Sequence, residues 1–151
     1  MKVIGIDPGL GGAVAVVNDR TFQDMASCPI IKAKGKSLYD EQAMANLLKV
    51  SFEVNLVVLE RVHFIHGQGG VSSFTFGTGY GIWLGILAAL KIPYMLVTPQ
   101  RWQKAMLDGG SGDTKVRAVM TANRLFPELH LKKSEHGKAD ALLMAIYGTR
   151  Q

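Results

Sequence analysis

The sequence predicts a single α/β domain over residues 1–151, in which a mixed five-stranded sheet carries helices on both faces. Two observations lead to this fold class. Short apolar runs separated by turn residues come first, and later apolar runs alternate with longer segments of helical periodicity. The chain has 151 residues, of which 48% are hydrophobic, and this is enough for one buried core. No repeat, low-complexity tract or linker interrupts the sequence.

The first part of the chain predicts three strands joined by tight turns. Val3–Ile6 and Ala13–Val17 are runs of small apolar residues, and the segment between them contains Pro8 and three glycines. Thr21–Met25 follows an Asn-Asp turn and predicts the third strand. We expect residues 26–37 to form a loop.

The next segment predicts a helix followed by a buried strand. A helix is expected to begin near Ser37, because Ser37 and Asp40 have the spacing of a capping box. Its apolar stripe would be formed by Met44, Leu47 and Leu48. Leu56–Leu59 is an uninterrupted apolar run, as expected of a strand covered on both faces, and it ends in Glu60.

The second half of the chain predicts one further strand among helices. The strand is Tyr94–Thr98. The expected helices are Phe74–Leu90, a short segment within 99–112 that also contains a glycine-rich loop, Lys115–Leu125 and Ala139–Tyr147.

The helix expected at 74–90 has an unusual glycine content. Gly77, Gly81 and Gly85 recur every four residues and would form a smooth ridge. Each interior glycine costs about 1 kcal/mol of helix stability relative to alanine, so close approach of another helix or backbone is expected to compensate.

Acidic residues occur where strands and a helix begin or end. Asp7 ends the first strand and Glu60 the fourth, so parallel pairing of these strands would bring both carboxylates to one edge of the sheet. Asp140 begins an apolar helix, and His136 lies one turn before it on the same face. Clustered carboxylates repel unless a cation lies between them, and oxygen donors suit Mg2+ or Mn2+.

Each of these residues also has a purely structural interpretation. Asp7 before Pro-Gly is a common turn former, and Glu60 would then be the first solvated residue after a strand. Asp140 would serve as a favourable charge near a helix N-terminus, and His136 as a structural histidine. The residue pattern alone leaves both interpretations open.

The charge and cysteine content limit the class of protein. The net charge is +5, and lysines cluster in the segment Lys32–Lys36, which indicates either a nucleic-acid surface or an ordinary solvated one. The single cysteine, Cys28, excludes an intramolecular disulfide and suits a reducing compartment. We expect a cytoplasmic protein with no targeting segment and no membrane span.

Several segments together resemble the RuvC-type Holliday junction resolvases, particularly their phage-like and chloroplast-like branch. The resemblance covers nearly the whole chain, and the order and spacing of its segments are more specific than any one of them. The segments are Ile4–Gly9, Val58–Glu60, Ser72–Gly85, Thr98–Trp102, Asp113–Lys115 and His136–Leu143.

The resemblance implies a ribonuclease-H-like fold, a homodimer, and two Mg2+ ions per active site, for which Mn2+ would substitute. The implied enzyme is a crossover junction endodeoxyribonuclease, which hydrolyses one phosphodiester in each of two opposed strands of a four-way DNA junction. Asp7, Glu60 and Asp140 match the acidic catalytic and metal-binding positions of the family. His136 falls where relatives carry a further ligand, and Glu135 is a second candidate for that place.

The resemblance also suggests contacts with DNA. Phe64 or Phe74 would stack on an unpaired base and Gln68 would hydrogen-bond a base, although Phe74 also suits a buried position at a helix start. The basic residues expected near the DNA backbone are Lys115, Arg117 and Lys138. The glycine ridge would pack at the dimer interface or within the core of one subunit.

Other functions compete with this interpretation. A ribonuclease-H-like nuclease acting on RNA–DNA hybrids or on other branched DNA would use the same acids, and a junction-binding protein without cutting activity would retain the fold. Actin-like kinases need a second lobe for which 151 residues leave no room. The segment Gly109–Lys115 lacks the residue order of a phosphate-binding loop, so no nucleotide cofactor is expected.

Overall fold

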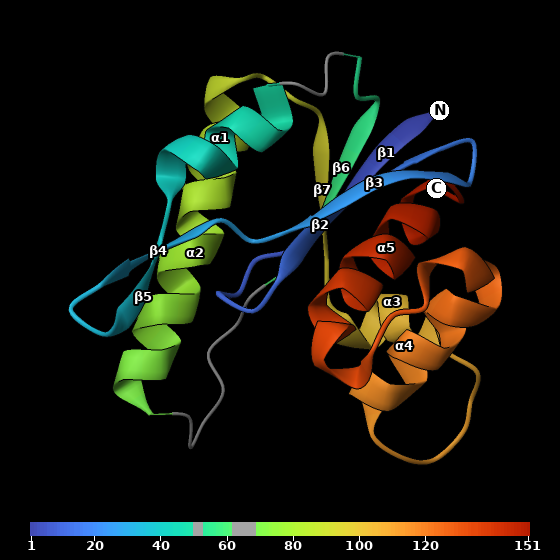
Figure 1. The fold of residues 1–151 in the computed structure, drawn as a ribbon. Coiled ribbons are helices and arrows are strands. Elements are labelled where there is room, and N and C mark those ends of the chain that lie inside the picture. Colours follow the sequence, from blue (N-terminus) through green and yellow to red (C-terminus); the bar gives the residue numbers. More distant parts are fainter. Residues whose placement is uncertain (50–52, 62–68) are drawn as a thin grey trace.

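A central sheet separates two layers of helices in the computed structural model, which describes residues 1–49, 53–61 and 69–151 (Figure 1). The strands are β1 (Lys2–Asp7), β2 (Ala13–Asn18), β3 (Thr21–Ser27), β4 (Ile30–Ala33), β5 (Lys36–Tyr39), β6 (Leu56–Glu60) and β7 (Tyr94–Val97). The helices are α1 (Glu41–Lys49), α2 (Gly70–Ala89), α3 (Pro99–Met106), α4 (Thr114–Leu125) and α5 (His136–Gly148), with short 3-10 turns at Pro127–Leu129 and Lys133–Glu135.

The main sheet is mixed and has the strand order β3-β2-β1-β6-β7. Strands β1, β2 and β3 pair antiparallel, whereas β1, β6 and β7 run parallel. Ile6 of β1 lies opposite Leu59 of β6, so the next residues, Asp7 and Glu60, leave the sheet at the same edge. The predicted mixed five-stranded sheet is therefore confirmed, together with the parallel pairing that the carboxylate argument required.

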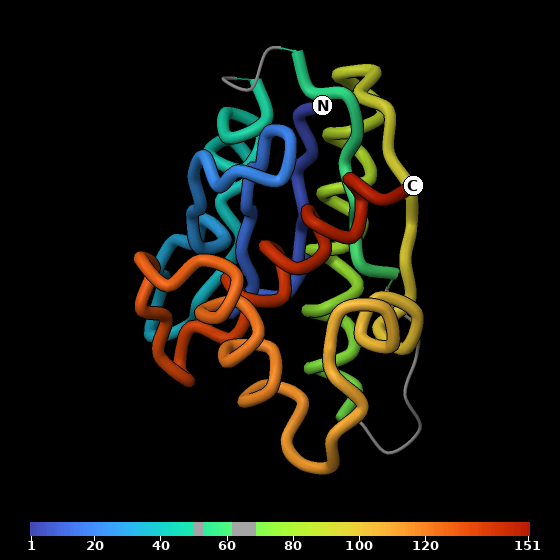
Figure 2. The backbone as a smooth tube through the Cα atoms, turned by 90° about the vertical axis from the view of Figure 1, so that its right-hand side faces the viewer, coloured from blue at the N-terminus to red at the C-terminus, as the bar shows by residue number. Residues whose placement is uncertain are grey.

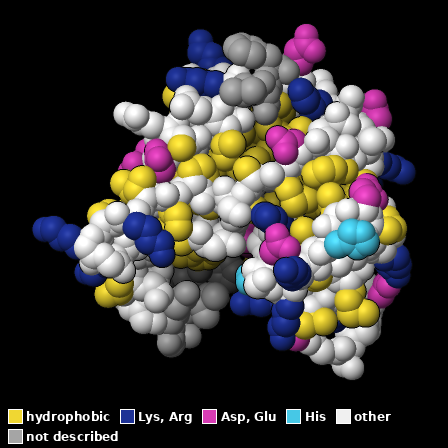
Figure 3. Space-filling model, in the orientation of Figure 1, with side chains coloured by type: hydrophobic (Ala, Val, Ile, Leu, Met, Phe, Trp, Pro, Cys, Tyr) yellow, Lys and Arg dark blue, Asp and Glu magenta, His cyan; other side chains and the backbone are white. Residues whose placement is uncertain are grey.

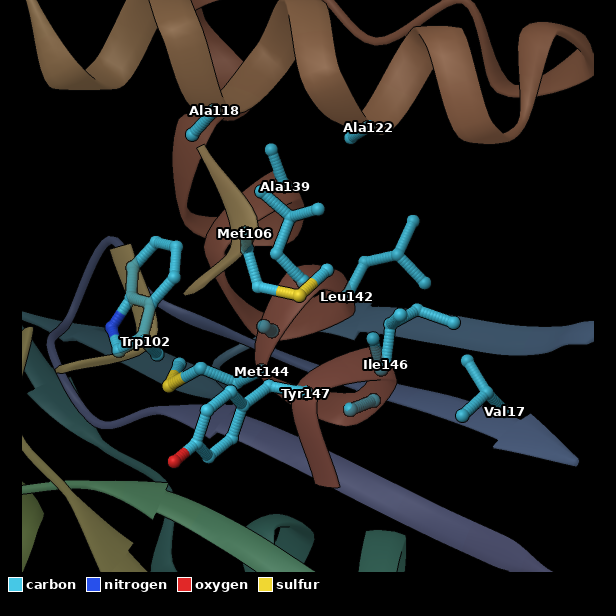
Figure 4. Packing of buried hydrophobic residues seen from close by; sticks show 14 of the residues in the cluster. Val17, Trp102, Met106, Ala118, Ala122, Ala139, Leu142, Met144, Ile146 and Tyr147 are labelled. Carbon is cyan, nitrogen blue, oxygen red and sulfur yellow. The ribbon is translucent and has the colours of Figure 1, made fainter. Parts of the chain in front are cut away.

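Helices cover both faces of this sheet, as predicted (Figures 1 and 2). Alternate residues of each strand enter different cores: Val3 and Val58 pack with α3, α4 and α5, whereas Ile4 and Val57 pack with α1 and α2. Figure 4 shows the first of these cores around Trp102 of α3 and Leu142 of α5. Among the described residues, no helix is both long and apolar enough to span a membrane.

Helix α5 lies directly against the backbone of β1. A Cβ atom at Gly5 would overlap the carbonyl oxygen of Ala141 and lie 2.6 Å from the amide nitrogen of Ala145. Residues Ala141–Gly148 are all buried. Glycine at position 5 therefore sets the distance between the central strand and the helix that begins at His136.

Residues 26–37 are not the loop that we predicted. They contribute to a two-stranded sheet, β4–β5, whose turn residues Lys34 and Gly35 have φ angles of 47° and 74°. Such angles are typical of a two-residue hairpin turn. The lysines that alternate in this segment gave no apolar strand pattern, so the sequence did not predict these two short strands outside the main sheet.

The start of the following helix also differs from the prediction. Ser37 belongs to β5, and α1 begins at Glu41. Asp40 caps it, because its Oδ1 accepts a hydrogen bond from the amide of Ala43 at 2.9 Å. Asp40 was therefore correctly included among the predicted capping residues, but the predicted capping box that began at Ser37 was wrong.

The glycine ridge of α2 faces outward. A Cβ atom at Gly77, Gly81 or Gly85 would meet no described atom within 4 Å. The interpretation that this ridge packs within the core of one subunit is therefore wrong. The tightly packed glycine is Gly79, where a Cβ atom would overlap the ring of Tyr39.

Candidate functional site

Asp7 lies in a compact turn at the end of β1. Its Oδ1 accepts a hydrogen bond from the amide of Gly9 at 3.4 Å. A Cβ atom at Gly12 would overlap the carbonyl oxygen of Asp7, so this position accepts only glycine without rearrangement of the turn. A Cβ atom at Gly9 would lie 3.2 Å from the ring of Phe76 on α2. The backbone of the turn is therefore tightly packed, and the amide of Gly9 orients one oxygen of the Asp7 carboxylate.

Glu60 reaches the same edge from the neighbouring strand. Its Oε1 accepts a hydrogen bond from the indole Nε1 of Trp102 at 2.8 Å. Trp102 belongs to α3, which begins directly after β7, and the indole is completely buried. Glu60 is only partly buried, and one of its two carboxylate oxygens is held by this hydrogen bond from the core.

The first turns of α5 bring two further groups to this edge. A Cβ atom at Gly137 would overlap the carbonyl oxygen of Gly11 and lie 3.2 Å from Oδ2 of Asp7, so α5 begins in contact with the Asp7 turn. His136 Nδ1 lies 4.0 Å from Oδ2 of Asp140. This nitrogen is buried and has no hydrogen-bond partner among the described residues.

The three carboxyl groups share an environment that opposes their ionisation. Burial raises the pKa of Asp7 to about 6 and that of Glu60 to about 7. Burial, together with the negative charges of Asp7 and Glu60, raises the pKa of Asp140 to about 8. These three groups therefore lie close enough to repel one another when ionised.

One basic residue acts on the same cluster. The positive charge of Lys115, at the start of α4, lowers the pKa of Asp7 and of Asp140, against the larger effect of burial. Burial, and next the charge of Lys115, also lower the pKa of His136, which favours the neutral imidazole. A neutral imidazole with a buried, unpartnered nitrogen is able to coordinate a cation.

This donor set fits a hard divalent cation. It combines three carboxylates in mutual repulsion with an imidazole nitrogen that lacks a partner, and a cation at this edge would relieve both conditions. Within the described ranges, no three His, Cys, Asp or Glu side chains already form a cluster able to hold a metal ion. The residues converge on one edge of the sheet without a preformed cage.

The raised carboxyl pKa values predict that the metal-free protein becomes less stable as pH rises. The unfolded chain releases these protons near pH 4, whereas the folded chain retains them up to pH values of about 6 to 8. The stabilising contribution is therefore complete below pH 4 and is lost as pH rises to 8. Thermal melts in a metal chelator should show a falling Tm between pH 5 and pH 8, and Mg2+ should raise Tm more at pH 8 than at pH 5.

A double variant, Asp7→Asn with Asp140→Asn, provides the control for these melts. It removes two of the three raised groups, so its Tm should change less over the same pH range and respond less to Mg2+. A wild-type Tm that rises steadily from pH 5 to pH 8 in chelator would contradict the shared, repulsive environment of the three acids.

The structure describes four of the six residues predicted to contact DNA, and Phe64 and Gln68 lie outside the described residues. Phe74 is 78% exposed, so its interpretation as a buried residue at a helix start is wrong. Lys115 is exposed, Arg117 donates a hydrogen bond to the carbonyl oxygen of Asp108, and Lys138 pairs with Glu135 at 2.8 Å. None of these contacts tests a role in DNA binding, so the DNA-binding roles of these residues stay predictions.

The two candidates for the additional ligand differ in their contacts. The carboxylate of Glu135 accepts hydrogen bonds from the ammonium of Lys138 and from the backbone amide of Lys132. Nδ1 of His136 accepts or donates no hydrogen bond among the residues that the structure describes. The geometry therefore favours His136 over Glu135 as a group available for a ligand.

Trp102 is the residue at this site that the sequence reasoning did not identify as functional. Its segment contributed only to the family resemblance, and 42 positions separate it from Glu60. One feature of the sequence could have identified Trp102. It follows shortly after the end of a strand parallel to β6, and such a position lies beside the acids at the strand ends.

Solved structures with the same fold are known. The structure titled "T. thermophilus RuvC in complex with Holliday junction substrate" matches with a TM-score of 0.67 and 14% sequence identity, over 99% of this chain and 95% of that one. A second structure of Thermus thermophilus RuvC matches with a TM-score of 0.64 and 19% identity, over 97% and 92% of the two chains. The fold of this protein is therefore RuvC-like and belongs to the ribonuclease-H-like type.

Comparisons of the sequence add nothing to this: no protein-family model and no curated protein matches the chain. At 14% to 19% identity the structural likeness establishes the fold. The function has to be argued from the site.

Proposed function

We propose that this protein is a structure-specific DNA endonuclease that resolves four-way junctions by metal-dependent hydrolysis, making paired symmetric nicks. The observation that carries the proposal is the convergence of Asp7, Glu60 and Asp140 at one edge of a RuvC-like sheet. The charge of Asp7 raises the pKa of Glu60 there, and the charges of Asp7 and Glu60 raise the pKa of Asp140. The similar RuvC structure in complex with a Holliday junction suggests the substrate. Residues 1–151 would act as one nuclease domain.

Four side chains at this edge of the sheet would hold two divalent ions per site, either Mg2+ or Mn2+. Bound divalent ions neutralise phosphate charge and lower the pKa of a coordinated water. Asp7, Glu60, Asp140 and His136 supply the oxygen and nitrogen donors, and Lys115 supplies a positive charge beside them. A Cβ atom added at Gly11 would meet no described atom within 4 Å, and a DNA backbone would pass on this open side of the turn.

DNA contacts beyond the metal site would come from several elements. The exposed Phe74 at the start of α2, or Phe64, would stack on an unpaired base at the crossover, and Gln68 would hydrogen-bond a base. Arg117 and Lys138 would assist Lys115 in binding phosphates.

A substrate competition separates this function from its rivals. Purified protein is incubated with labelled four-way junction, linear duplex and RNA–DNA hybrid, with Mg2+, with Mn2+ or with chelator. We expect cleavage of the junction in preference to the other substrates, and only with metal. Equal cleavage of the hybrid would favour a ribonuclease-H activity, and tight junction binding without cleavage in either metal would favour a non-cutting binding protein.

A homodimer suits paired cuts, because its two-fold axis can match the symmetry of the junction. The outward face of α2 is the surface that we propose for this contact. It combines Gly77, Gly81 and Gly85 with the exposed apolar side chain of Val71. Glycines on a helix face permit close approach of a second helix, which offsets their cost to helix stability.

Substitution of Gly81 by lysine tests the dimer separately from the fold. The new side chain enters open space in one subunit, and lysine favours helix more than glycine does, so the subunit should remain folded. We expect light scattering to give the mass of one 16.4 kDa chain, and junction cleavage to yield single nicks rather than paired cuts. Ala105→Lys, at an exposed position of α3, should leave the dimer intact. A dimer that survives Gly81→Lys would place the interface elsewhere.

The β4–β5 hairpin carries a second basic surface. Tyr39, at its base, packs against Gly79 next to the carbonyl oxygen of Pro8. Lys32, Lys34 and Lys36 are exposed, and none of them forms an ion pair within the described part of the chain. In Figure 3, dark blue side chains project from the left-hand edge, where Figure 1 shows the hairpin.

Neutralising these three lysines should weaken binding of the junction. Replacing all three with glutamine should lower affinity about tenfold and reduce the slope of log K against log salt, because fewer counterions are released from DNA. The matched control replaces Lys2, Lys49 and Lys91 with glutamine, at the end of the sheet opposite to Asp7. If both triple variants lose the same affinity and show the same reduction in salt dependence, binding depends on net charge and not on the hairpin.

A further inference from the structure

The two tryptophans of this protein are both completely buried, but their indole nitrogens differ. Nε1 of Trp102 donates a hydrogen bond to Oε1 of Glu60 at 2.8 Å. Nε1 of Trp83, on α2, is buried and has no acceptor among the described residues. The indole of Trp83 therefore only packs in the core, whereas the indole of Trp102 also connects the core to the acidic edge of the sheet.

Packing holds the indole of Trp102 in place. Trp102 lies in the core formed with α4 and α5, which Figure 4 shows together with Met106 and Met144 of the same cluster. Helix α3 begins with Pro99 directly after β7, and Val97 of β7 lies opposite Glu60 of β6. The donor thus comes from a rigid element beside the strand that carries the acceptor.

We infer that Trp102 is a positioning residue, which occupies Oε1 of Glu60 with its indole and thereby presents Oε2 to a divalent cation. The inference rests on the proposed function and deepens it, because it assigns the support of one metal ligand to a residue outside the ligand set.

The chemistry of the donor supports this role. An indole N–H is neutral and donates a single hydrogen bond, so it fixes the direction of a carboxylate without neutralising its charge. A lysine or arginine in the same place would compete with the cation for both oxygens. Partners of this kind restrict the orientation of a ligand before the metal binds, and their removal typically lowers metal affinity or activity by about 10- to 100-fold.

Nuclear magnetic resonance tests the inference on the wild-type protein. The probe is Mg2+ alone, without DNA, and the readout is the pair of indole 1H–15N cross-peaks, assigned with Trp83→Phe and Trp102→Phe. We expect a saturable shift of the Trp102 cross-peak and no shift of the Trp83 cross-peak. In Glu60→Gln, which keeps an oxygen acceptor but loses the charge, the response of Trp102 should be lost.

A matched pair of variants provides the second readout. Trp102→Phe and Trp83→Phe each replace a fully buried indole with a phenyl ring, so both disturb a core to a similar degree. Only Trp102→Phe should raise the Mg2+ concentration for half-maximal junction cleavage, by about 10-fold or more, with a smaller change in the rate at saturating Mg2+. Should Trp102→Phe fail to fold, the wild-type titration still decides the question.

The possible outcomes separate the inference from the function on which it rests. If Mg2+ shifts the backbone amide of Gly9 but not the Trp102 indole, or if both Phe variants need the same Mg2+ as wild type, the positioning role is wrong and the nuclease proposal stands. If Mg2+ shifts no resonance at the Asp7 turn, the proposed metal-dependent function is wrong, and the role of Trp102 is rejected with it.

Discussion

Asp7→Asn should abolish junction cleavage and leave junction binding nearly unchanged. Asparagine has the shape of aspartate but lacks the charge that holds a divalent cation, and Asp7 lies beside both Glu60 and Asp140. We expect the cleavage rate at saturating Mg2+ to fall by about 1000-fold or more, because the variant would lose a proposed metal ligand and with it a transition-state interaction. Single-turnover cleavage and a gel-shift titration measure the two effects.

The matched control is Asp24→Asn, which makes the same chemical change at an exposed position of β3. It should cleave at the wild-type rate. Because Asp7 carries a raised pKa, its replacement should also leave the metal-free protein folded, and at pH 8 more stable than wild type. An Asp7→Asn protein that is unfolded would support the structural interpretation of Asp7, and one that cleaves normally would exclude a metal role.

Gly5→Ala should destabilise the protein by about 3 kcal/mol or more, which is a large share of the stability of a typical domain. The added methyl group would overlap the carbonyl oxygen of Ala141 and crowd the amide nitrogen of Ala145, both of which are backbone atoms that no rotamer change can move away. Helix α5 would have to shift away from β1. Urea denaturation followed by circular dichroism measures the effect.

Gly11→Ala is the control for this prediction. A Cβ atom at Gly11 would meet no described atom within 4 Å, and the position is exposed, so the free energy of unfolding of this variant should differ little from wild type. A Gly5→Ala variant as stable as Gly11→Ala would mean that α5 and β1 do not lie in direct backbone contact.

The sequence was sufficient to predict the main sheet because its strands carry strong local patterns. Leu56–Leu59 is an unbroken apolar run, and such runs occur in strands covered on both faces. The rule that parallel strands present their carboxyl ends at one edge then placed Asp7 beside Glu60, and the observed register agrees. Both inferences required only short-range pattern and one topological rule.

Other features depend on contacts that no local pattern encodes. The β4–β5 hairpin is too short and too rich in lysine to show strand periodicity, so Ser37 was placed in a helix start. The direction of the ridge at Gly81 depends on which face of α2 meets the sheet, and glycine periodicity is the same in either case. The hydrogen bond between Trp102 and Glu60 joins elements that are distant in the chain.

The contact between Gly5 and α5 has a consequence for the history of such proteins. The residues that hold the strand and helix together are small and buried, whereas Asp7, two positions after Gly5, and Asp140, directly before Ala141, are only partly buried. A lineage in which the proposed cleavage is no longer selected can therefore change one of these acids in a single mutational step and keep the architecture intact. Among descendants of this chain, glycine at position 5 should outlast aspartate at position 7.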